Sequence, residues 1–282
     1  ALMAEAFFGY LLPWGQMSYW GAQVIISLFG AIPVVGETLS LWIRGDYVVS
    51  DITLNRFFAF HVIALPFAIA GLVLLHILAL HHVGSNNPDG IDIKANKDPA
   101  GKPLDGIPFH PYYTIKDAPA IVGLLILMSI VIFFAPEMGG YFLEHNNFVP
   151  ADPLKTPEHI APVWYFTPFY SILRANTINF FMVPAKLWGV IFMGLGTMAF
   201  FLLPWLDRGK VRSIRYRGWI YKTALSIFVV SFLILGYLGL LPPTPGRTAV
   251  AQVCTILYFL FFLLMPFYTK WDKTKPVPER VT

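Results

Sequence analysis

Five long runs of apolar residues constrain the fold of this 282-residue chain more than any other feature. A helix needs roughly 20 mostly apolar residues to cross the hydrocarbon layer of a bilayer, because each residue advances only about 1.5 Å. The runs of this length are 57–80, 118–136, 187–206, 219–241 and 249–268. The sequence therefore predicts an all-α, polytopic transmembrane bundle with five complete spans.

Composition supports this fold class. Hydrophobic residues make up 56% of the chain and charged residues only 13%, whereas a soluble domain of this length carries far more charge. Residues 1–13 are also apolar, but they are too few to cross a bilayer and lack the layout of a signal peptide. We interpret them as the end of a sixth span, so that the chain is expected to be a fragment.

The single cysteine, Cys254, lies within the last apolar run. One cysteine excludes an intrachain disulfide, an array of zinc fingers and the C-x-x-C-H motif that attaches haem covalently. Any haem bound by this chain must therefore be held non-covalently.

The loops between the runs differ in charge. Fourteen of the 20 Lys and Arg residues lie in three segments, 81–117, 207–222 and the C-terminal tail, which alternate with the other loops. Basic loops stay on the cytoplasmic side of a membrane, so these three segments are predicted to lie inside. This rule explains the basic loops better than binding of lipid headgroups or nucleic acid.

Two amphipathic stretches, 17–43 and 152–177, fall on the opposite, outer side and are rich in Trp, Tyr and Pro. Such helices usually lie along the membrane interface. From the residues alone, two interpretations stay open: the stretches anchor the protein, or they form a lid over a pocket between helices.

Two histidines, His61 and His76, share the first apolar run. Fifteen regular helical steps bring them to roughly 60° past four whole turns and about 22 Å apart along the axis. An ionisable residue in a span normally faces the bundle interior, and neutral imidazole is the usual protein ligand of haem iron. The pair therefore predicts two haem ligands at different depths, with hydrogen bonding to a neighbouring helix as the alternative. Pro66 is expected to bend this helix.

Several motifs resemble cytochrome b, the haem subunit of ubiquinol–cytochrome c oxidoreductase, and they follow the family's order along the chain. They are GYLLPWGQMSYWG at 9–21, RFFAFH at 56–61, GSNNP at 84–88, PYYTIKD at 111–117, PVWY at 162–165 and FYSILR at 169–174. The family fold has eight membrane helices, and the resemblance implies that this chain begins inside the third.

The resemblance implies two b-type haems, bound non-covalently. It makes His61 a ligand of the low-potential haem near the outer side and His76 a ligand of the high-potential haem near the inner side; the opposite axial ligands come from helices that precede this chain. Gly9 and Arg56 are the other haem-side residues. Arg56 is expected to pair with a haem propionate, although a side chain that reaches to the interface is an equally good account.

The resemblance also implies two pockets for ubiquinone and ubiquinol. The inner, quinone-reducing pocket would contain His81, Ser85, Asn86, Lys116 and Asp117. The alternative is that these are ordinary interfacial residues that cap a loop. The outer, quinol-oxidising pocket would contain Met17, Gly21, Val24 and Ile25 on one wall and Pro162, Val163, Trp164, Tyr165 and Tyr170 on the other, with Tyr165 as a catalytic residue.

Two departures from the family pattern matter. Val163 stands where the family usually has a glutamate that is proposed to accept a proton from quinol, and valine cannot accept one. Our hypothesis is that Glu158, five residues earlier, takes over this role, against the alternative of an ordinary surface glutamate. The spacing of His61 and His76 is also one residue longer than in most respiratory members and closer to the photosynthetic relatives.

These observations predict the haem- and quinone-binding subunit of a quinol–cytochrome c oxidoreductase, which couples electron transfer to a proton gradient. Residues 1–89 would belong to the N-terminal haem-binding region and 90–282 to the C-terminal region. Expected partners are a Rieske-type iron–sulfur protein, a cytochrome c1-type subunit, a second copy in a homodimer and membrane lipid, but no nucleic acid. A bacterial inner membrane is preferred over a mitochondrial one. The rivals are a proton-coupled secondary transporter and a di-haem membrane anchor of another oxidoreductase.

Overall fold

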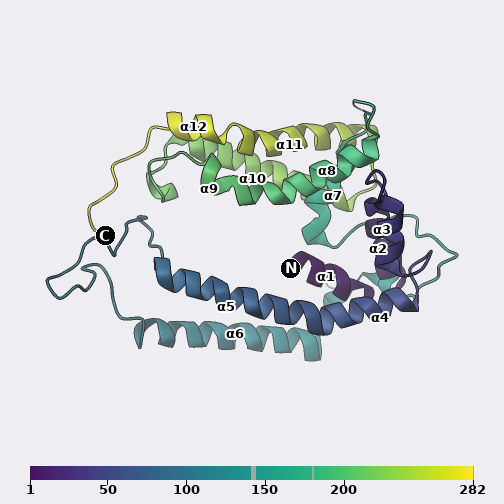
Figure 1. Cartoon of the computed structure of the whole chain (residues 1–282), viewed down its shortest axis with the longest axis horizontal. Coiled ribbons are helices and arrows are strands. Elements are labelled where there is room, and N and C mark those ends of the chain that lie inside the picture. Colours follow the sequence, from purple (N-terminus) through teal and green to yellow (C-terminus); the bar gives the residue numbers. More distant parts are fainter. Residues whose placement is uncertain (141–143, 180, 282) are drawn as a thin grey trace.

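The computed structural model describes residues 1–140, 144–179 and 181–281, and the described residues are helical apart from loops and isolated β-bridges. The N-terminal half is shown in purple to teal in Figure 1. Its helices are α1 (Leu2–Leu11), α2 (Gln16–Phe29), α3 (Gly36–Arg44), α4 (Asp51–Ala59), a π-helical turn (Phe60–Ala64), α5 (Leu65–Val83) and α6 (Tyr112–Phe134).

The C-terminal half forms a separate group of helices beside α1 to α6 (Figure 1). Its helices are α7 (Thr167–Ala175), α8 (Ala185–Met198), α9 (Leu203–Leu206), α10 (Trp219–Leu240), α11 (Pro245–Leu263) and α12 (Met265–Trp271). Short 3-10 turns occupy Met138–Gly140, His145–Asn147, Trp164–Phe166, Ala199–Leu202 and Ile214–Tyr216.

Five helical segments of the described chain are long and apolar enough to cross a membrane, which confirms the predicted fold class. They are Asp51–Val83, Tyr112–Phe134, Ala185–Leu206, Trp219–Leu240 and Pro245–Leu263. The first begins six residues before the apolar run because Ser50 and Thr53 cap it, with the Ser50 N–H donating to Thr53 Oγ1 over 3.1 Å. The predicted last span divides into α11 and α12. Residues 2–11 form a short apolar helix.

The helix that carries the two histidines is not regular between them. The Leu65 N–H bonds to the Phe60 carbonyl, five residues back, in the π-helical turn that contains His61. A π turn accommodates one extra residue, so the fifteen residues from His61 to His76 rotate the chain about as far as fourteen α-helical residues would. His76 therefore lies roughly 40° short of four whole turns after His61, instead of roughly 60° past them. The regular-helix expectation was therefore wrong in detail, but both histidines keep to one side. Pro66 follows the π turn directly.

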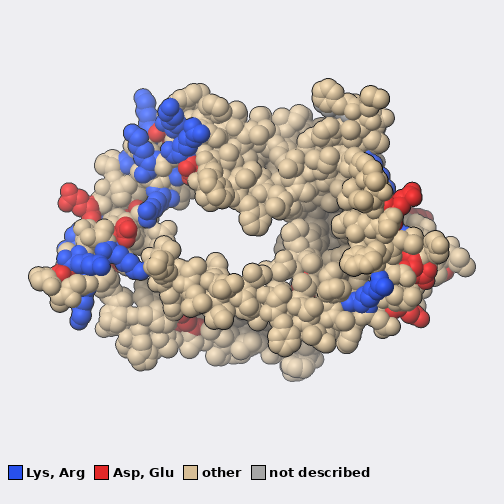
Figure 2. All heavy atoms as spheres, in the orientation of Figure 1, with Lys and Arg blue, Asp and Glu red and all other residues tan. Residues whose placement is uncertain are grey.

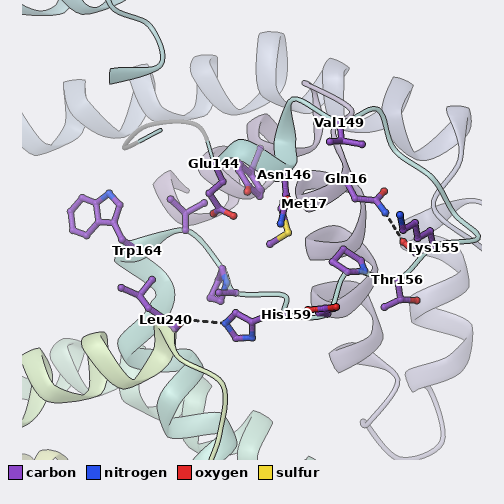
Figure 3. Close-up of a pocket in the computed structure, with 16 residues that line it drawn as sticks. Gln16, Met17, Glu144, Asn146, Val149, Lys155, Thr156, His159, Trp164 and Leu240 are labelled. Carbon is purple, nitrogen blue, oxygen red and sulfur yellow. Dashed lines mark hydrogen bonds between the residues drawn. The ribbon is translucent and has the colours of Figure 1, made fainter. Parts of the chain in front are cut away.

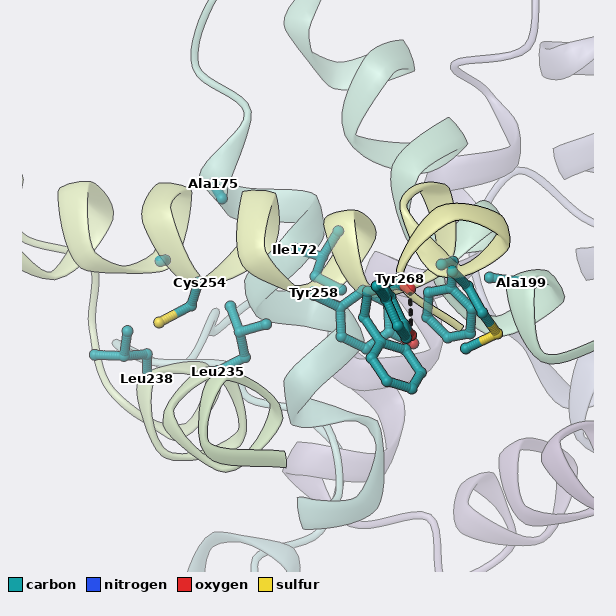
Figure 4. Close-up of a cluster of buried hydrophobic side chains, with 12 residues drawn as sticks. Ile172, Ala175, Ala199, Leu235, Leu238, Cys254, Tyr258 and Tyr268 are labelled. Atoms are coloured by element: carbon teal, nitrogen blue, oxygen red, sulfur yellow. Dashed lines mark hydrogen bonds between the residues drawn. The ribbon is translucent and has the colours of Figure 1, made fainter. Parts of the chain in front are cut away.

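The main buried core lies between α7, α10 and α11 (Figure 4). Ile172, Leu235 and Tyr258 are fully buried there, and the Tyr258 hydroxyl donates to the Gly196 carbonyl over 2.7 Å. Within the predicted 152–177 stretch, α7 packs against α10 and α11 inside the bundle. Arg174 explains how a charged helix can do so: its guanidinium donates to the Leu238 carbonyl of α10 over 2.7 Å.

Gly239 permits the close contact between α10 and α7. A Cβ added at Gly239 would collide with the backbone carbonyl of Thr167. We therefore expect Gly239→Ala to destabilise the bundle by about 1–3 kcal/mol, since backbone atoms cannot move aside as a flexible side chain can. Thermal unfolding of the solubilised protein should show a midpoint several degrees lower. Gly246→Ala, where an added Cβ has open space, is the control, and equal shifts in both variants would contradict this account.

A second buried cluster joins α1, α2 and α4 around Leu11, Tyr19, Ile26 and Phe57. By contrast, no residue of α5 or α6 is buried. Figure 2 shows an opening through the molecule between α5 and the C-terminal helices. The second cluster therefore holds α1 and α2 against α4, at the start of the helix that carries the two histidines.

Basic residues gather at one end of the molecule, on the left in Figure 2. Ion pairs organise this end: Arg215 with Asp89 at 2.7 Å, Arg217 with Asp207 at 2.7 Å, and Arg280 with Asp105 at 2.8 Å. Burial alone would raise the pKa of Asp207, but hydrogen bonds from Arg217 and Gly209 outweigh it and hold that pKa below its usual value. The predicted cytoplasmic segments thus share one end of the fold.

Candidate functional site

His61 is held against α1. A Cβ added at Gly9 would collide with the imidazole, so glycine is what lets the ring approach the α1 backbone. His61 Nδ1 lies 3.0 Å from the carbonyl oxygen of Glu5 and 3.0 Å from its carboxylate. A carbonyl oxygen can only accept, so Nδ1 carries a hydrogen, and Nε2 is the ring nitrogen left to bind a metal.

Glu5 was missed by the sequence reasoning. It precedes Gly9 by four residues, which places both on one face of α1. That spacing was the available signal, once Gly9 had been assigned to the haem side.

His76 lies on α5, fifteen residues after His61, and its side chain is exposed. The described residues contain no cluster of three or more His, Cys, Asp or Glu that could hold a metal ion by themselves. Single imidazoles at two depths are instead the donors that suit iron held in a macrocycle. Arg56, the other haem-side candidate, donates to the Trp42 carbonyl over 2.6 Å.

A polar cavity of about 720 Å³ opens beside α1 and α2 (Figure 3). Five predicted residues line it: Met17, Glu158, Pro162, Val163 and Trp164. Figure 3 shows Glu144 and Met17 on one side of the cavity and His159 on the other. Tyr10, Glu144, Lys155 and His159 also line it and were missed by the sequence reasoning.

An apolar cavity of about 430 Å³ lies next to the polar cavity. Four further predicted wall residues line it, Gly21, Val24, Ile25 and Tyr170, together with Pro162. Pro162 lines both cavities, so the two share a wall. Tyr165 lines neither of them, and burial raises the pKa of its hydroxyl. The structure thus brings together two segments that lie about 140 residues apart in the chain.

Backbone hydrogen bonds fasten the 144–152 segment to the turn between α1 and α2. Gln16 N–H donates to the Val149 carbonyl over 2.8 Å, and Ala151 N–H donates to the Trp14 carbonyl over 3.1 Å. The buried Asn147 side chain accepts from Ser18 N–H over 2.9 Å. These contacts fix the wall of the polar cavity that carries Glu144.

The residues predicted for the inner pocket lie at the basic end. His81 stands near the end of α5, Ser85 and Asn86 follow that helix, and Lys116 and Asp117 stand in the second turn of α6. All five side chains are exposed, and neither of the two large cavities contains any of them. The structure therefore gathers them at one end of α5 and α6 without enclosing them.

Comparison with known families gives two matches. Residues 1–168 match the family described as "Cytochrome b(N-terminal)/b6/petB", and residues 150–259 match the one described as "Cytochrome b(C-terminal)/b6/petD". Together the matches extend from the first residue to within α11. They confirm the resemblance that the motifs indicated.

Individual relatives agree with the family matches. "Cytochrome b" of Allochromatium vinosum is 61% identical, over 100% of this chain and 68% of the relative. "Cytochrome b" of Rickettsia prowazekii is 49% identical, over 99% of this chain and 65% of the relative. A chain of the solved "Hyperthermophilic respiratory Complex III" superposes with a TM-score of 0.81 at 36% identity, over 96% of this chain and 67% of the other. The chain thus spans about two thirds of the length of these relatives.

Proposed function

This chain belongs to the cytochrome b family, and from that premise we propose that it is the haem- and quinone-binding part of a quinol–cytochrome c oxidoreductase. In this proposal, quinol is oxidised at an outer site and quinone is reduced at an inner site, with electrons crossing the membrane between them. The family assignment and the five candidate spans place the protein in a membrane as a multi-pass chain. A bacterial inner membrane is the proposed location.

The donor set fits two b-type haems. His61 presents Nε2, because its Nδ1–H is directed at Glu5, and His76 offers a second imidazole further along the same side of the helix. Bound haem would supply one-electron redox chemistry at each depth, while the chain supplies ligands, burial and hydrogen bonds that tune it. Gly9 supports this use of His61, since it removes the side chain that would push the ring away.

Helix α1 carries the observation on which the outer site rests. Gly9 touches the His61 ring, Tyr10 lines the polar cavity, and Phe8 lines the apolar cavity. A quinol bound at the shared wall would therefore lie beside Phe8 and Tyr10, the neighbours of the glycine that contacts the His61 ring. The apolar cavity suits the ring and tail of a ubiquinol, and the polar cavity offers groups that exchange protons.

Other parts of the proposal rest on the family. Tyr165 is proposed as a catalytic residue and Arg56 as a partner of a haem propionate. The inner quinone site would use His81, Ser85, Asn86, Lys116 and Asp117, where His and Asp side chains can take up protons near neutral pH. The domain division at residues 89 and 90 also stays a prediction.

The proposed partners are a Rieske-type iron–sulfur protein, a cytochrome c1-type subunit, a second copy of the complex and membrane lipid. The likeness to a chain of a solved respiratory complex supports a multi-subunit assembly. The iron–sulfur protein would accept the electron that does not cross the membrane.

A reduced-minus-oxidised visible spectrum of the full-length protein in its membrane tests the proposal. We expect a b-type haem band that appears when quinol is added. A membrane transporter would show no such band. A di-haem anchor of another oxidoreductase would show the band, but its reduction by quinol would not drive reduction of cytochrome c. Either result would overturn the proposal.

A further inference from the structure

The two proposed haem ligands differ in what surrounds their imidazole rings. His61 Nδ1 lies 3.0 Å from a carboxylate oxygen of Glu5, in addition to its contact with the Glu5 carbonyl. The exposed His76 ring has no hydrogen bond or ion pair with any residue that the structure describes. Resting on the function proposed above, we propose that Glu5 is a positioning residue that orients His61 and lowers the reduction potential of the haem bound there.

Aromatic packing places Glu5 beside the His61 ring. The centroid of the Phe8 ring lies 4.5 Å from that of Phe57 and 5.4 Å from that of Phe60. Phe60 adjoins His61 in the π turn, so these contacts hold α1 against the turn that carries the ligand. Glu5 precedes Phe8 by about one turn of α1 and therefore faces the same helix. The contact between carboxylate and imidazole thus follows from the packing of two helices.

No basic residue of the described chain neutralises the Glu5 carboxylate. Its ion-pair partner is the His61 ring, and its side chain is only 20% exposed. The second carboxylate oxygen, Oε2, is buried and has no hydrogen-bond partner among the described residues. Arg56, five residues before His61, donates to the Trp42 carbonyl instead. Because water and counter-charges are scarce around it, this carboxylate is screened less than one at the surface.

A carboxylate at Nδ1 acts on a bound iron through the imidazole ring. When Nδ1–H donates to Glu5, electron density moves toward Nε2, which becomes a stronger donor to the metal. Ferric iron carries one more positive charge than ferrous iron, so a stronger donor and a nearby negative charge both favour the ferric form. The reduction potential of the haem at His61 therefore falls. The neutral carbonyl of Glu5 alone would have a smaller effect.

The test is a potentiometric titration of both b-type haems in membranes that contain the assembled complex. Glu5→Gln keeps the length of the side chain and an oxygen that can accept from Nδ1, so it removes the charge and preserves the bond. We expect both haems to stay bound. The equilibrium of the haem at His61 should shift about tenfold toward the reduced form, which raises its midpoint potential by about 59 mV. The midpoint of the haem at His76 should not change.

Three further variants make the titration decisive. The haem that His61→Leu removes identifies which midpoint belongs to His61. Glu5→Ala removes the carboxylate without placing an amide beside the ring, so it measures the same midpoint a second time and should also raise it. The matched control is Glu37→Gln, which removes the same charge from an exposed position on α3 and should leave both midpoints unchanged.

The outcomes separate the two proposals. If wild type shows no b-type haem, or haem that quinol does not reduce, the proposed function fails, whatever Glu5 does. If wild type holds both haems and the midpoints of Glu5→Gln and Glu5→Ala equal those of wild type, the Glu5 proposal alone is overturned. An equal rise of both midpoints, or the same rise in Glu37→Gln, would also overturn it, because the effect would not then act through His61.

Discussion

His61→Leu should remove one of the two proposed b-type haems from the full-length protein in its assembled complex, and His76→Leu should remove the other. Leucine has a similar volume but no lone pair, so the iron loses the only axial ligand that this chain provides at that depth. Extracted haem per protein should fall from two to one in each variant.

The matched control for the haem experiment is His82→Leu, which makes the same change on the same helix at a position with no proposed role. The amount of protein in the membrane should be measured in parallel, so that loss of the chain is not read as loss of haem. Two haems in either His61→Leu or His76→Leu would contradict the ligand assignment.

Deleting Ile63 from the π turn should leave both haems bound. The deletion removes the extra residue, so the turn can become regular α-helix while His61 and His76 keep nearly the same relative orientation. Deleting Val73, an apolar residue as exposed as Ile63 but in regular helix, should instead rotate His76 by about 100° away from its side.

Haem content separates the two deletions. We expect two haems after deletion of Ile63 and one after deletion of Val73. Equal loss in both variants would show that the π turn does not compensate for the longer histidine spacing.

Much of the fold could be predicted from the sequence because a bilayer leaves few choices. All five spans follow from apolar length, since every backbone group in lipid must bond within its own helix. The ends of the spans were less predictable, because capping decides them. Ser50 and Thr53 start the first span well before the apolar run.

The π turn and the buried position of α7 could not be predicted from local patterns. The long histidine spacing indicated a departure from the family, but nothing in residues 60–64 shows where the helix absorbs the extra residue. For α7, the amphipathic sequence left two interpretations open, an anchor at the interface or a lid over a pocket. In the structure, its arginine finds carbonyl acceptors on α10, so the polar face is satisfied inside the bundle.

The outer site was predictable in part. The motifs around Met17 and Pro162 identified both walls, because each wall is a continuous segment. Glu144 and Tyr10 were missed because they lie about 130 residues apart in the sequence. Backbone hydrogen bonds between their two segments bring them together only in the folded chain. A single acid in a loop carries no local signal that distinguishes it from a solvated residue.

The wall that Pro162 shares between the two cavities matters for the design of selective inhibitors. A compound that fills the apolar cavity and reaches past Pro162 meets a hydrocarbon side chain at Val163 and a carboxylate at Glu144. A hydrogen-bond donor of such a compound that is directed at Val163 finds no acceptor on that side chain. Directing the donor at the Glu144 carboxylate instead would pair it, and a donor left without an acceptor in a buried site weakens binding.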